Sequence, residues 1–169
     1  MNVIVRSVLL SAVLIVSWNS TTFQSSKSSP PELKPGWKRV DAAGSFSFSV
    51  PETMRKVKVQ GVDSYVGQYA SNGLHVLFDY GMYSDPLERY SNEAEYIEIN
   101  RKIAGLDARI VFFRQPNHAS KHRYFAAVHI PKVAGDRGEG ITKLTMVAQF
   151  NEQSDWGTAQ NIFESIRFK

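Results

Sequence analysis

Alternating apolar and polar residues run along most of the chain after residue 36, and this period of two is typical of half-buried β-strands. The segment 46–50 places Phe46, Phe48 and Val50 on one side, and Pro51 ends it. Four longer alternating segments predict further strands, at 74–80, 106–114, 124–130 and 144–150. We interpret the last three as half buried, which is the usual state of a strand in an antiparallel sheet.

Weaker signals occupy the stretches between these strands. Short extended segments are predicted at 57–59, 64–69 and 96–103. Asn72-Gly73 predicts the turn of a hairpin, because both residues tolerate the left-handed backbone that such turns need. Asp85-Pro86 predicts a turn or a short helical piece that reaches about residue 93.

A three- and four-residue spacing near the C-terminus predicts one amphipathic helix, whose apolar face holds Trp156, Ala159, Ile162, Phe163 and Ile166. Ser154 or Asp155 is the expected N-cap, and Arg167 is expected in the last turn. One helix can cover one face of a sheet. We therefore expect a single α+β domain over 37–169, with a mainly antiparallel sheet covered on one face by the C-terminal helix and the short helical piece.

The first 36 residues lack this alternation. Arg6 precedes an apolar run at 7–18 that has the length of a signal peptide and is short of the roughly 20 residues of a transmembrane helix. We expect residues 1–20 to be an export signal or, since no Ala-x-Ala cleavage pattern is present, an uncleaved N-terminal anchor. Residues 21–36, rich in Ser, Thr and Pro, are interpreted as a linker. The protein is therefore expected outside the cytoplasm, periplasmic or secreted, with a membrane contact only through an uncleaved N-terminal segment.

Composition excludes several classes of site and partner. The chain has 169 residues, a net charge of only +4 and no cysteine. Without cysteine there is no disulfide, thiolate metal site or cysteine nucleophile. The charge surplus is small and is not gathered beside exposed aromatic residues in one segment, so we expect no nucleic-acid partner.

Three short motifs resemble the PsbP-like, DcrB-like and Mog-type superfamily of small exported or organellar α+β domains. They are Phe46-Ser-Phe-Ser-Val-Pro51 at the first strand, Ile103-Ala-Gly-Leu-Asp-Ala-Arg109 in the middle and Phe163-Glu-Ser-Ile-Arg-Phe168 at the end. The resemblance covers about 37–169. It implies a mostly non-enzymatic protein that binds protein partners, metal-containing assemblies or components of the cell envelope, and it assigns no functional residue.

The residues typical of catalysis or metal binding occur without the spacing that such sites need. His118 and His122 are four apart, but Pro116 and the neighbouring strands place them in a hairpin loop rather than on a helix. No Gly-x-Ser-x-Gly motif is present. We therefore predict no catalytic residue, no metal site and no cofactor. The alternative is a small metal-dependent or hydrolytic enzyme that uses His75, Asp79 and His129, which requires these three side chains to converge in one pocket.

The stretch 79–86, Asp-Tyr-Gly-Met-Tyr-Ser-Asp-Pro, is the strongest candidate for a recognition surface. Tyrosine offers a large contact area together with a hydroxyl, and two carboxylates lie close by in sequence. The competing interpretation is that Tyr80 faces the core and Asp85 only begins a turn. Our main hypothesis is a non-catalytic binding or accessory domain that recognises a protein or envelope component through Asp79, Tyr80, Tyr83 and Asp85. The partner's identity and the oligomeric state are left open.

Overall fold

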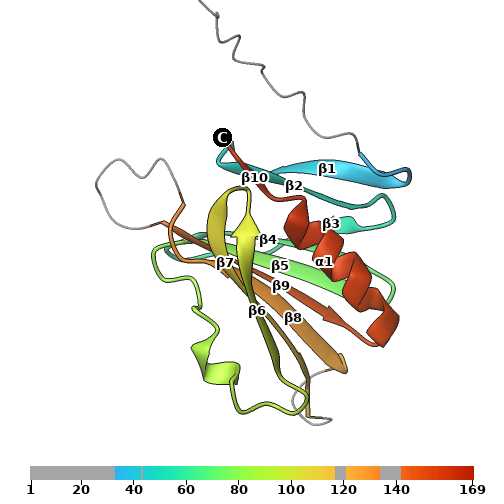
Figure 1. Ribbon diagram of the computed structural model, residues 1–169. Helices are drawn as coiled ribbons and strands as arrows, with labels where there is room; N and C mark the ends of the chain where they lie inside the picture. Colours follow the sequence, from blue (N-terminus) through green and yellow to red (C-terminus); the bar gives the residue numbers. More distant parts are fainter. Residues whose placement is uncertain (1–32, 43, 117–120, 134–141) are drawn as a thin grey trace, which may run out of the picture. The chain divides into compact units, whose positions relative to one another are not determined.

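Antiparallel strands dominate the structure (Figure 1). The computed structural model describes residues 33–42, 44–116, 121–133 and 142–169. The predicted signal or anchor, most of the predicted linker and His118 lie outside the described residues. Residues 32–169 form one compact unit, and within its described part no helix is both apolar and long enough for a membrane crossing.

Seven strands form the larger sheet, and every neighbouring pair in it is antiparallel. In spatial order they are β3 (Arg55–Val57), β4 (Tyr65–Ser71), β5 (Leu74–Gly81), β9 (Lys143–Phe150), β8 (Tyr124–Ile130), β7 (Leu106–Arg114) and β6 (Ile97–Ile103). The predicted hairpin at Asn72-Gly73 is confirmed, since Ser71 pairs with Leu74 and Gly73 has a φ of 84°.

A smaller sheet has three strands, with β2 (Phe46–Pro51) between β1 (Trp37–Ala42) and β10 (Arg167–Phe168). The helical elements are η1 (Glu88–Tyr90), η2 (Gln153–Asp155) and α1 (Trp156–Glu164). The predicted α+β class with a mainly antiparallel sheet is confirmed.

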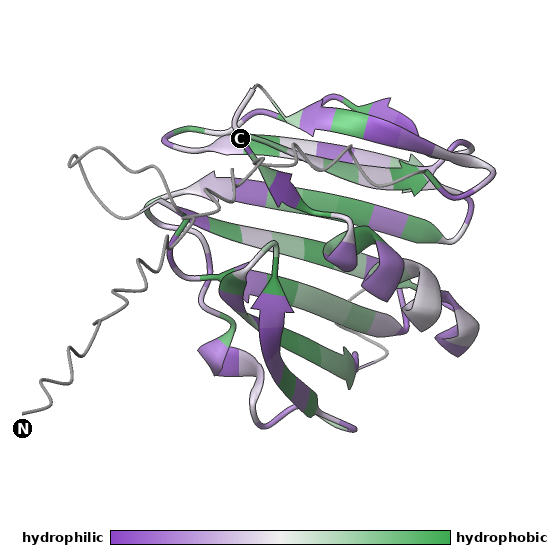
Figure 2. Cartoon of the chain, turned by 45° about the horizontal axis from the view of Figure 1, so that its top comes forward, coloured by the Kyte–Doolittle hydropathy of each residue, from purple (hydrophilic) through white to green (hydrophobic). Residues whose placement is uncertain are grey.

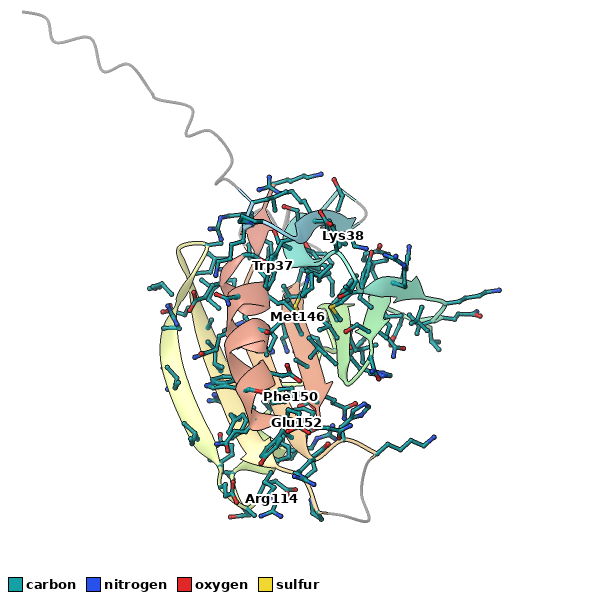
Figure 3. The ribbon with its side chains drawn as sticks, turned by 90° about the vertical axis from the view of Figure 1, so that its right-hand side faces the viewer. Trp37, Lys38, Arg114, Met146, Phe150 and Glu152 are labelled. Carbon is teal, nitrogen blue, oxygen red and sulfur yellow. The ribbon has the colours of Figure 1, made fainter. Side chains whose placement is uncertain are left out.

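The main core lies between α1, the smaller sheet and one face of the larger sheet, which we call the inner face. From α1 it receives Ala159, Ile162 and Phe163, as the helical spacing predicts. Figure 3 shows Met146 and Phe150 of β9 beside α1, and both are fully buried. Green, hydrophobic stretches run along the central strands in Figure 2. Burying these apolar side chains supplies the main driving force for folding.

A second, smaller core lies on the opposite face, which we call the outer face. It contains Leu87, Val111, Phe113, Phe125 and Ala127, with Tyr90 packed against it. The expectation that β7 and β8 are only half buried is therefore wrong. The segment around η1 covers their outer side, so the short helical piece lies on the face opposite α1 rather than beside it.

Two details at the ends of α1 also differ from expectation. Asp155 occupies the N-cap position but makes no side-chain capping hydrogen bond there. Arg167 lies beyond the helix, in β10, because the chain straightens after Ser165 to pair with β2. The Ser165 hydroxyl oxygen accepts a hydrogen bond from the Ser49 backbone N–H at 2.7 Å and thereby joins the helix end to β2.

Candidate functional site

A cavity of about 360 Å³ lies on the outer face where the segment around η1 stops covering the sheet. We call it the outer-face pocket. It is lined by Gln68, His75, Leu77, Asp79, Asp85, Arg89, Tyr90, Phe125, Thr145, Val147 and Gln149. Its volume is near the lower end of the range of about 300–1,000 Å³ for small-ligand sites.

Strand register explains the floor of this pocket. Leu77 of β5 pairs with Gln68 of β4 on one side and with Val147 of β9 on the other. The next outer-facing pair toward one end is Asp79 with Thr145, and toward the other end it is His75 with Gln149. The pocket thus has an apolar floor, a carboxylate at one end, and an imidazole with an amide at the other.

The wall of the pocket is the segment from Asp85 to Tyr90. Asp85 Oδ1 accepts a hydrogen bond from the Leu87 backbone N–H at 2.8 Å, and Asp85 Oδ2 lies 2.7 Å from the Arg89 guanidinium. The same guanidinium lies over the Tyr90 ring, 4.9 Å from its centre. Tyr90 in turn packs at 5.0 Å against the rings of Phe113 and Phe125 of the second core. The charge of Asp85 is therefore compensated within the wall.

Asp79 differs from Asp85 in this respect. Its Oδ1 is buried and has no hydrogen-bond partner among the described residues, and the same holds for the Ser84 hydroxyl five residues later. The Thr145 hydroxyl, which is in register beside Asp79, donates its proton to the Asp85 carbonyl at 2.7 Å. Buried polar atoms are nearly always paired in folded proteins. Asp85 has Arg89 as its counter-ion, whereas within the described part of the chain Asp79 forms no ion pair and leaves one buried oxygen unpaired.

Two histidines meet at the other end of the pocket. The rings of His75 and His122 are 4.5 Å apart. Burial is the main cause that lowers the pKa of His122, and the nearby His75 and Lys121 lower it further. Among the described residues, no three histidine, aspartate or glutamate side chains lie together in a way that could hold a metal ion.

His129 lines a different cavity, of about 670 Å³, together with Arg109, Lys143 and Glu88 among others. Its Nδ1 is 2.8 Å from the Thr145 hydroxyl oxygen. Since Thr145 donates its only proton to Asp85, His129 must donate from Nδ1, which leaves Nε2 as an acceptor. Burial, followed by the charges of Lys143 and Arg109, lowers the pKa of His129 and favours this neutral form.

The structure separates the three residues of the enzyme alternative. His75 and Asp79 line the outer-face pocket, four residues apart on one strand, whereas His129 lines the larger cavity on the far side of Thr145. They do not converge in one pocket.

The four predicted recognition residues do not share one surface either. Asp79 faces the outer-face pocket, while Tyr80 faces the inner side, where its ring is 5.4 Å from that of Phe46. Tyr80 therefore follows the competing interpretation, in which it belongs to the core. Tyr83 is 74% exposed, and Asp85 both begins the turn and forms part of the pocket wall.

Sequence reasoning missed Val62, which lies on the turn adjacent to that of Tyr83. Val62 is fully exposed and Met82 is 44% exposed. A Cβ atom placed on Gly81 would lie 2.6 Å from Cβ of Ser64, so the turn after Gly61 and the turn after Gly81 lie side by side. We call Val62, Met82 and Tyr83 the apolar tip. The isolated valine carries no motif that would have identified it from the sequence.

Comparison with known proteins identifies the fold. The chain is similar to the solution structure of cyanobacterial PsbP (CyanoP) from Synechocystis sp. PCC 6803, with a TM-score of 0.51 and 16% sequence identity. The match covers 84% of this chain and 98% of that one. No protein-family model and no curated protein matches the chain. The expected likeness to the DcrB-like and Mog-type branches stays a prediction, whereas the PsbP-like fold of the chain is confirmed.

Proposed function

We propose that this protein is an exported, non-catalytic accessory domain that binds a protein or envelope component through the apolar tip. The observation that carries the proposal is the exposure of Met82 and Tyr83 on one turn and of Val62 on the adjacent turn. Tyrosine and methionine are enriched where protein interfaces are buried. The similarity to cyanobacterial PsbP supports the proposal only through the shared fold.

Each member of the tip is a large side chain whose burial against a partner is favourable. Fully burying an exposed aliphatic or aromatic side chain contributes about 1.5–3 kcal/mol. Three such side chains on two adjacent turns offer an apolar anchor, and Asp63 and Asp85, which are near them in sequence, are polar residues of the kind found in interface rims.

Site-specific photo-crosslinking tests the proposal. A photoreactive phenylalanine analogue at position 83 should form a defined cross-linked product in the native cell envelope. The same analogue at position 97 is the matched control. Ile97 is also exposed, at 52%, but it lies on β6, an edge strand of the larger sheet that is separated from β5 by β9, β8 and β7. Identical products at both positions, or none at position 83, would contradict the assignment.

Export is tested separately by fractionation. Full-length protein should be recovered outside the cytoplasm, and the N-terminal sequence of the recovered protein distinguishes a cleaved signal from an uncleaved anchor. Recovery only from the cytoplasm would contradict the proposed export while leaving the cross-linking result to be judged by itself.

A further inference from the structure

We propose that the outer-face pocket receives a basic side chain, lysine or arginine, from the bound partner protein, with Asp79 as its counter-ion. This inference rests on the proposed function, since it specifies which chemistry the partner must present next to the apolar tip. It concerns a cavity that the tip does not include.

The charges that line the pocket favour a cationic ligand. The ionisable residues that line the pocket are Asp79, Asp85, Arg89, Tyr90 and His75. Asp85 and Arg89 form an ion pair at 2.7 Å, and Arg89 also lies over Tyr90. Asp79 forms no such ion pair with any residue that the structure describes, and its register neighbours Val66 and Thr145 are neutral. One negative charge in the pocket therefore lacks compensation, which favours a cationic ligand.

The shape of the pocket suits a long side chain with a charged end. Between Asp79 and the His75 end lies an apolar floor of Leu77 and Val147, and Leu77 is 41% exposed although it sits on the face of a sheet. Lysine and arginine carry an apolar stem below a charged head. A stem laid along Leu77 and Val147 would bring its head to Asp79, so the floor and the carboxylate fit the same side chain.

The pocket and the apolar tip are also close along the chain. Asp79 lies near the end of β5, and Met82 and Tyr83 follow the last residue of that strand, Gly81. A partner segment that covers Met82 and Tyr83 passes close to Asp79. This placement favours a side chain of that partner over a free amine as the source of the cation.

Titration of the full-length protein with capped amino acids tests the charge and shape arguments. Nα-acetyl-lysine amide and Nα-acetyl-arginine amide, which keep their charged side chains, should perturb the backbone NMR signals of Leu77, Asp79 and Val147. Nα-acetyl-norleucine amide, which has an apolar stem but no charge, should not. Asp79→Asn should weaken binding at least tenfold. Asp107→Asn is the matched control, because Asp107 is an exposed acid outside this pocket whose replacement removes the same charge.

Several outcomes would overturn the inference. It fails if norleucine binds as well as lysine, or if Asp79→Asn binds lysine as tightly as the wild type. Loss of structure in Asp79→Asn would not obscure the answer, because lysine binding to the wild-type protein must also weaken at high salt, and insensitivity to salt equally refutes the ion pair.

The cross-linking experiment separates this inference from the proposed function. If the product at position 83 persists in Asp79→Asn at the same partner concentration, the partner binds without the pocket and only this inference is overturned. If lysine binds through Asp79 but no product forms at position 83, the proposed function is contradicted, and with it the partner protein as the source of the cation. Support requires lysine binding together with weaker cross-linking in Asp79→Asn.

Discussion

Replacement of Gly67 by alanine should destabilise the protein through a single contact. Gly67 of β4 lies opposite Phe78 of β5, and the Phe78 ring rests against the glycine backbone. A Cβ atom at position 67 would lie 2.4 Å and 2.5 Å from two ring carbons of Phe78. Carbon atoms pack at about 3.5–4.0 Å, so the ring must move by roughly 1 Å.

Phe78 has little room for that movement. It is only 2% exposed, and its ring lies 5.2 Å from Phe46, 5.7 Å from Phe48 and 5.4 Å from Tyr65, centre to centre. Extra carbon in such a core costs about 1–3 kcal/mol. The lower chain entropy of alanine in the unfolded state returns about 0.4–1 kcal/mol. At the midpoints of these ranges, the expected net loss for Gly67→Ala is about 1.3 kcal/mol.

Urea unfolding followed by tryptophan fluorescence measures this loss. Gly157→Ala in helix α1 is the matched control. A Cβ atom added at position 157 would have no described atom outside the helix backbone within 4 Å, so this substitution should raise stability by about 0.5–1 kcal/mol. In a Phe78→Leu background, the cost of Gly67→Ala should shrink, because the clashing ring is absent. A Gly67→Ala protein as stable as the wild type, or an equal cost in both backgrounds, would refute the reasoning.

Three further predictions concern the outer face. Leu87→Ala should lower the free energy of unfolding in urea by about 2–4 kcal/mol, because this side chain is fully buried in the second core. A loss below about 0.5 kcal/mol, which is usual for an exposed site, would contradict that role. The pKa of His129 is lowered by folding, so as the pH drops below the ordinary value of 6.5 the unfolded state takes up the proton first and stability falls. His129→Asn should therefore reduce the fall in melting temperature between neutral and acidic pH. An unchanged dependence of the melting temperature on pH would contradict this role of His129. Burial, followed by a hydrogen bond to Glu98, raises the pKa of Tyr96 to about 12. In an absorbance titration, the tyrosinate step at the highest pH should therefore disappear in Tyr96→Phe. If that step persists, another tyrosine is responsible for it.

The strands could be predicted from the sequence because each long segment keeps one face in the main core. The alternation in 74–80 and 144–150 places the same residues inward that the structure buries. The second core escaped prediction because Val111 and Phe113 occupy the other face of a strand that already has a complete apolar face. Whether both faces of β7 are buried depends on which loop covers the second face, and the spacing of residues within the strand does not predict this.

The candidate site was predictable only in part, for a similar reason. Asp79 and Tyr83 were recognisable as residues at the exit of a strand, yet their surroundings come from elsewhere in the chain. The pocket exists because Tyr90 docks on Phe125, and the tip is extended by Val62 from the preceding turn. The inward position of Tyr80 follows directly from the period of two, which places it with Phe78 rather than with Asp79.

The pairing of β10 with β2 has a consequence for the order in which the protein folds. The hydrogen bond between the Ser49 backbone and Ser165 joins residues 116 apart in sequence, and Phe168 pairs with Phe46 just beyond it. Until Phe168 has been synthesised and has reached β2, one edge of that strand lacks its native neighbour. When the chain is made from its N-terminus, the edge of β2 that pairs with β10 therefore stays without this partner for most of the synthesis. Closing that long loop is the kind of step that slows folding and exposes strands to wrong partners.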